Sequence, residues 1–129
     1  MKKSFVRGTW QQKRAFSPAV ITEGAGRIVW VAGHTGHKDD SGGSLAGDFD
    51  AQCRQTFRNI EKTLGEAGCT LADLVTMTVF LIDARHTTRM TELRTEILGR
   101  DFPASAAITV SGFADAAMMI EIQGVAVAQ

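Results

Sequence analysis

The segment from Leu74 to Ile82 restricts the fold more than any other part of the sequence, because both of its alternating faces are apolar. The two sets of side chains are Val75, Met77, Val79 and Leu81 on one face, and Leu74, Phe80 and Ile82 on the other. β-Branched and aromatic residues favour a strand, and apolar character on both faces is typical of a sheet covered on both sides. We therefore expect a sheet whose two faces are both buried.

Two helices are predicted to pack against this sheet. The first runs from about Asp48 to Ala67, with an apolar stripe at helical spacing formed by Phe49, Cys53, Phe57, Ile60, Leu64 and Ala67. Asp48 is suited to cap its start, and Gly68 stands where a left-handed residue would end it. The second helix runs from about Thr87 to Leu98 and is closed by Gly99, with the inward residues Met90, Leu93 and Ile97.

The other strands complete an α+β order of strands, helix, strand, helix, strands. They are predicted at Ser4–Arg7, Ala19–Thr22, Arg27–Ala32, Ser105–Ser111 and Met118–Ala128. In the last strand, one face carries Ile120, Ile122 and Ala126, and the other carries Met119, Glu121, Gln123, Val125 and Val127. Two helices cover only one side of a five- or six-stranded sheet. In so short a chain, the second side is expected to be buried by another copy of the same protein.

Length and charge narrow the class of protein. The 129 residues fit a single domain, residues 1–129, and Lys plus Arg equal Asp plus Glu at 14 each. A net charge of zero argues against nucleic-acid binding through a basic face, and no apolar run is long enough for a membrane span. Cys53 and Cys69 are typical of reduced cytosolic thiols. We expect a cytoplasmic protein with neither a nucleic acid nor a membrane as its partner.

The stretch from Gly36 to Gly47 is the one linker-like segment of the sequence. It is rich in glycine, aspartate and serine, and it is long for a connection without regular structure. Two interpretations stay open, a mobile lid over a site or a plain hairpin loop.

Several segments, in this order and spacing, resemble the Rid (YjgF) family. They are Phe16–Val20, Val29–His34, Gln52–Thr56 with Asn59–Ile60, Ala67–Gly68, Leu74–Leu81, Phe102–Ala104 and Ile120–Val127. The resemblance covers nearly all of the chain from Phe16 onward. It implies a chorismate-mutase-like fold, with a six-stranded, mostly antiparallel sheet and two helices on one face. It also implies a trimer whose sheets line a central barrel, which would supply the cover for the second face.

The resemblance further implies clefts between subunits in which imines and enamines are hydrolysed. Gly33 matches a glycine at a strand end, and Glu121 matches a glutamate on the last strand. Phe16 falls where the family has a tyrosine. Ser105 falls at the position of the arginine that holds the substrate carboxylate, and Ala107 at that of a cysteine. The chain is thus expected to be a divergent member with a modified substrate-binding region.

Glu121 and His34 are the candidate catalytic residues. Burial of the Glu121 carboxyl between subunits would favour its uncharged form, which suits a group that exchanges protons near neutral pH. His34 follows Gly33 at a strand end and would donate to a substrate atom. A structural glutamate and an ordinary loop histidine are the alternatives.

The substrate-binding candidates are Gly33, Phe16, Ser105, Ala107, Thr109 and Phe113. The hydroxyls of Ser105 and Thr109 would bind a smaller or neutral substrate, and Phe113 would either form a wall of the pocket or pack in the core. His34, His37, Asp39 and Asp40 are too loosely spaced to predict a metal site.

The resemblance implies a homotrimer that hydrolyses or deaminates an imine, enamine or related C–N bond of a small nitrogen-containing metabolite. No cofactor is expected, because water is the only other reactant. The alternative is a trimer of the same fold that binds a small ligand or acts like a chaperone without catalysis.

Overall fold

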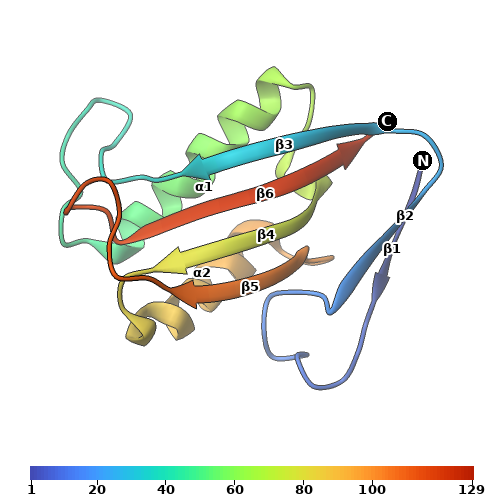
Figure 1. Ribbon diagram of the computed structural model, residues 1–129, viewed down its shortest axis with the longest axis horizontal. Helices are drawn as coiled ribbons and strands as arrows, with labels where there is room; N and C mark the ends of the chain where they lie inside the picture. Colours follow the sequence, from blue (N-terminus) through green and yellow to red (C-terminus); the bar gives the residue numbers. More distant parts are fainter.

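The computed structural model describes all residues from 1 to 129, which form six strands and two α-helices (Figure 1). The strands are β1 (Lys2–Val6), β2 (Ala19–Glu23), β3 (Arg27–His34), β4 (Leu74–Leu81), β5 (Ala104–Thr109) and β6 (Ile120–Ala128). The helices are α1 (Phe49–Glu66) and α2 (Thr87–Leu98), and short 3-10 turns precede β4 and α2. The predicted order of strands, helix, strand, helix, strands is confirmed.

The six strands divide into two sheets, so the expectation of one six-stranded sheet was wrong. The larger sheet has the strand order β3-β6-β4-β5, and β1 pairs only with β2. All pairings are antiparallel except that of β4 with β5, so the mostly antiparallel character is confirmed. Gly24, with φ 86°, lies in the turn between β2 and β3, and beyond this turn the β1–β2 ribbon diverges from the larger sheet (Figure 1).

Both helices lie on the same side of the larger sheet (Figure 1). The stripe predicted for α1 is buried, with Cys53, Phe57, Ile60 and Leu64 at most 2% exposed. Asp48 caps the helix by accepting a hydrogen bond of 3.0 Å from the Ala51 amide, and Gly68 follows its end with φ 75°. Burial raises the pKa of the Cys53 thiol to about 12, so this cysteine is an inert core residue.

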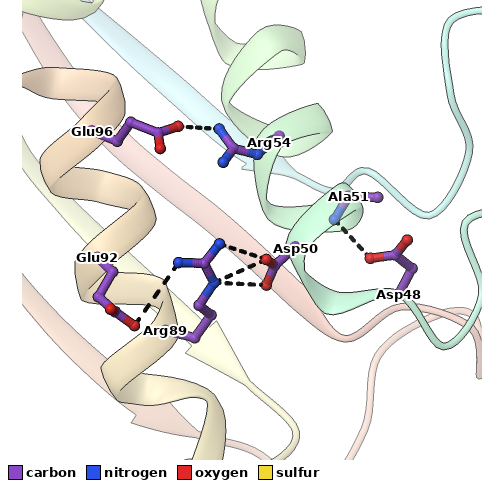
Figure 2. Close-up of polar contacts among 7 residues, drawn as sticks. All are labelled: Asp48, Asp50, Ala51, Arg54, Arg89, Glu92 and Glu96. Carbon is purple, nitrogen blue, oxygen red and sulfur yellow. Dashed lines mark hydrogen bonds and ion pairs between the residues drawn. The ribbon is translucent and has the colours of Figure 1, made fainter.

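Ion pairs join the two helices along their solvent side (Figure 2). The Arg89 guanidinium donates through Nε and Nη2 to the Asp50 carboxylate, at 2.9 and 2.6 Å from Oδ2. A second bridge connects Arg54 to Glu96. The pKa of the Asp50 carboxyl is lowered by the hydrogen bonds from Arg89.

No helix covers the sheet face opposite α1 and α2 (Figure 1). Trp30 is 78% exposed on this face, and Ile28 is 57% exposed. A broad hollow of about 470 Å³ runs across β3, β6 and β4, and Trp30, Thr76, Gln123 and Val125 contribute to its lining. We call this surface the bare face. The sequence pattern predicted that the two helices of one chain would leave this face uncovered.

Candidate functional site

Gly33 and Glu121 meet where β3 and β6 depart from regular pairing. Val31 pairs with Gly124 and His34 with Ile122, so two residues of β3 lie opposite Gln123 alone, which is a β-bulge. A Cβ atom at Gly33 would lie 2.4 Å from Glu121 Oε2, so only glycine leaves the carboxylate its place. Glu121 is half-buried and has no hydrogen-bond or ion-pair partner in the chain. At the bulge, the Glu121 carboxylate therefore has no partner and lies beside the exposed backbone of Gly33.

His34 points the other way, towards α1. Its Nδ1 lies 2.7 Å from the Ala32 carbonyl oxygen, and its Nε2 lies 2.7 Å from Thr63 Oγ1. Both ring nitrogens of His34 therefore have partners within the chain, and these contacts hold the end of β3, and with it the bulge, against the helix.

Ser105, Ala107 and Thr109 alternate along β5 on the helix side of the sheet. Ser105 pairs with Met77, whose side chain is buried against the helices, and residues paired across neighbouring strands share a face. The Ser105 hydroxyl accepts a hydrogen bond of 2.8 Å from Arg94 Nη1 of α2. Ala107 and Thr109 are exposed because they lie on an edge strand.

The two phenylalanines expected to shape the pocket lie at different ends of β5. Phe16 packs at 5.6 Å between ring centroids against Trp10, in a segment that is held to the start of β5 by the hydrogen bond from Ser17 N to Pro103 O. Phe113 lines a cavity of about 520 Å³ beyond the far end of the strand, with His86, Asp115 and Met119 among its neighbours.

A single chain thus brings together only Gly33 and Glu121 among the predicted site residues. Glu121 belongs to the bare face, whereas Ser105 belongs to the helix side of the same sheet. One pocket within one chain does not contain both. A cleft that uses both groups has to combine the bare face of one copy with the β5 edge of another.

The loop from Gly36 to Gly47 forms a hairpin, which is one of the two interpretations of its sequence. Lys38 and Ser44 form an antiparallel bridge, and the Asp39 carboxylate accepts from the amides of Ser41 and Gly43 at 2.9 and 2.7 Å. Asp40 is paired with Lys62 of α1 at 2.5 Å, which lowers the pKa of the Asp40 carboxyl. The acidic residues of the loop are therefore engaged, Asp39 within the loop and Asp40 with α1.

Two polar residues that the sequence interpretation passed over are buried. Gln52 of α1 donates to the carbonyls of Leu45 and Ala117 at 3.0 and 2.8 Å, and it accepts from the Met119 amide at 2.9 Å. Arg94 is 2% exposed. Its burial could have been predicted from the apolar stripe of α2. Arg94 falls in that stripe with Met90, Leu93 and Ile97, at the spacing i, i+3, i+4, i+7.

No helix of the chain is both long enough and apolar enough to traverse a lipid bilayer.

Known proteins place the chain in a family. The sequence model described as endoribonuclease L-PSP matches residues 10–128. A RutC family protein of Pyrococcus horikoshii is 33% identical over 102 residues, which are 79% of this chain and 80% of that protein. The human 2-iminobutanoate/2-iminopropanoate deaminase is 29% identical over 112 residues, 87% of this chain and 79% of the human one.

The fold agrees with that grouping. The crystal structure of a Rid family protein of unknown function from Yersinia pestis superposes with a TM-score of 0.83 and covers 98% of both chains, at 24% identity. Matched along almost its whole length, the chain belongs to the Rid (YjgF) family, the family of the endoribonuclease L-PSP model.

Proposed function

We propose that this protein is a cofactor-independent hydrolase or deaminase that acts on an imine, enamine or related C–N bond of a small metabolite. The observation that carries the proposal is the half-buried Glu121 carboxylate, which has no partner in the chain and lies against the open backbone of Gly33. The similarity to the human 2-iminobutanoate/2-iminopropanoate deaminase supports the choice of reaction.

Glu121 would act as the proton-transfer group. Its carboxylate accepts a proton from water as the water oxygen bonds to the sp2 carbon of the C=N group, whose electron pair moves to nitrogen. Glu121 passes this proton to the nitrogen, which gives a neutral carbinolamine. It then accepts the hydroxyl proton of the carbinolamine and delivers it to the nitrogen as the C–N bond breaks, so that a carbonyl compound and ammonia leave and the carboxylate is restored. The backbone at Gly33 is close enough to bind the reacting group.

The site would lie between subunits of a homotrimer. Exposed apolar side chains such as Trp30 and Ile28 on the bare face need a cover, and three sheets facing a central barrel would provide one. In the same arrangement the β5 edge of a neighbouring chain, with Ser105, Ala107 and Thr109, would approach Glu121. Phe16 and Phe113 would border the two ends of that edge.

A non-catalytic trimer that binds a small ligand is the second candidate. It is favoured by one observation, the engagement of both His34 ring nitrogens within the chain, which leaves Glu121 without a second titrating group. Such a protein would bind the ligand saturably and release no ammonia.

The test is ammonia release from 2-aminoacrylate generated in situ, compared among no protein, wild type and Glu121→Gln. We expect the wild type to accelerate release and Glu121→Gln to abolish the acceleration while the assembly stays intact by light scattering. Glu61→Gln is the matched control, because Glu61 is exposed on α1 and its replacement makes the same change of charge. Turnover by Glu121→Gln at the wild-type rate would remove Glu121 from the mechanism, and no acceleration by wild type would favour the binding protein.

A further inference from the structure

Arg94 carries a charge that the chain does not neutralise. The side chain is 2% exposed, its only hydrogen bond goes from Nη1 to Ser105 Oγ at 2.8 Å, and its Nε is buried without a partner. It takes part in none of the ion pairs of the chain. Burial lowers the pKa of the Arg94 guanidinium to about 10, so the group is still protonated at neutral pH. A buried charge without a counterion is costly, and a bound anion would offset that cost.

Two other arginines of the same region show what a guanidinium does here when an anion is available. Arg89 grips Asp50 through its Nε–Nη2 edge (Figure 2), with Nη2 at 2.6 Å from Oδ2. Arg85 grips Asp83 through the same edge, at 3.0 Å from Nε and 2.7 Å from Nη2. The Nε–Nη2 edge of Arg94 contacts no carboxylate, and only Nη1 donates a hydrogen bond. The chain therefore leaves this edge of Arg94 without an acceptor.

Ser105 connects this charge to the surface. It is half-buried near the start of β5, an edge strand whose outer side has no partner strand beyond the bridge between Ser17 and Ala104. Because Oγ accepts the hydrogen bond from Arg94, the hydroxyl proton of Ser105 is free to be donated outward. A group bound at Ser105 would meet a donor hydroxyl backed by a positive charge in a region of low dielectric.

We infer that Arg94 and Ser105 together form a binding site for a small carboxylate, in which Ser105 contacts the anion and Arg94 supplies the charge behind it. One cation and one neutral hydroxyl match a monoanion better than a phosphate with two charges. Arg94 is thus a specificity-determining residue that acts through Ser105. The inference rests on the proposed function in one respect: it takes the carboxylate to be part of the substrate of that reaction.

The test uses 2-oxobutanoate as the probe and 2-butanone as its neutral analogue, with binding measured by isothermal titration calorimetry on the full chain. We expect the wild type to bind 2-oxobutanoate saturably and 2-butanone far more weakly. Arg94→Met and Ser105→Ala should each weaken 2-oxobutanoate binding by about 10-fold or more, as expected when a hydrogen bond to a charged group is lost. Arg58→Met is the matched control, because it removes an exposed positive charge from α1 and should leave the Kd unchanged.

A purely structural role of Arg94 predicts a different pattern. Equal Kd values for wild type, Arg94→Met and Ser105→Ala would overturn the inference, as would equal binding of the ketone and the keto acid. Thermal unfolding without ligand adds a second readout, because Arg94→Met removes an unpaired buried charge and should not lower the Tm. If Arg94→Met does not fold, Ser105→Ala decides the question with Arg94 still in place.

The inference and the proposed function fail in different experiments. Binding of 2-oxobutanoate that depends on Arg94, without ammonia release by wild type, would overturn the hydrolase and leave the carboxylate site. Ammonia release at the wild-type rate by Arg94→Met would overturn the carboxylate site and leave the hydrolase.

Discussion

The two faces of the larger sheet are built from neighbouring residues of the same strands, yet they have opposite surroundings. On the helix side, Val79 and Ile122 are at most 1% exposed. On the bare face, Trp30 is 78% exposed, and Glu121 has no partner. The apolar side chains of the helix side are buried within one chain, whereas those of the bare face are not. Most of the folding stability of one chain is therefore expected from the helix side, and assembly and the chemistry of Glu121 are expected from the bare face.

The largest effect is expected from a cavity on the helix side. Phe57 is 2% exposed in the core under α1, so Phe57→Ala should lower the free energy of unfolding by about 3–5 kcal/mol. Urea denaturation monitored by circular dichroism measures this change. A loss below about 1 kcal/mol would mean that the assembly, rather than the core of each chain, supplies most of the stability.

Gly33→Ala should lower the turnover that depends on Glu121 without lowering the stability of the fold. Its Cβ would lie 2.4 Å from Glu121 Oε2 and would displace the carboxylate, and we expect turnover to fall about 100-fold. Gly65→Ala is the control, because a Cβ there meets nothing within 4 Å. Wild-type turnover by Gly33→Ala would show that the position of the carboxylate is not critical.

Trp30→Ala should separate assembly from folding. Because this side chain is mostly exposed in one chain, its removal should change the stability of the isolated fold by about 0.5 kcal/mol or less. Its loss should nevertheless shift sedimentation towards smaller species. An unchanged oligomer would place the interface elsewhere than on the bare face.

The smallest effect is expected at the solvent side of the two helices. Arg89→Met removes the partner of Asp50, and an exposed ion pair contributes little to stability because water and salt screen it. The pKa of Asp50 is lowered in the folded chain, so this contribution is present above the unfolded pKa of about 3.9 and is lost as the pH falls through the folded value. Wild type and Arg89→Met should therefore differ in stability at pH 7 and converge in acid. A difference that persists at pH 2 would assign the effect to packing of the Arg89 side chain.

Local patterns were sufficient to predict most of the fold. The spacing of apolar residues, with Asp48 and Gly68 as end signals, predicted α1 to within a residue of its observed bounds at Phe49 and Glu66. The division into two sheets was not predictable in this way. It depends on which strand edges meet, and the alternation of side chains within β1 and β2 carries no information about their partners.

The candidate site was less accessible to sequence. The family pattern selected Gly33 and Glu121, and they are adjacent, but the bulge that joins them involves the pairing of β3 with a strand about ninety residues later. The partner of His34 is Thr63, which no motif connects to it. Arg94 escaped notice because an arginine is normally expected at the surface, even when it occupies a position in an apolar stripe.

The strand order has a consequence for how the protein is made. β6 is formed by residues 120–128, yet it lies between β3 and β4 in the sheet. During synthesis, the earlier strands leave the ribosome with a gap between them, and each exposes an unpaired edge until β6 arrives. The sheet closes only when this late segment enters its middle. Nascent chains that stall before residue 120 should therefore be targets for chaperones and proteases rather than partly assembled sheets.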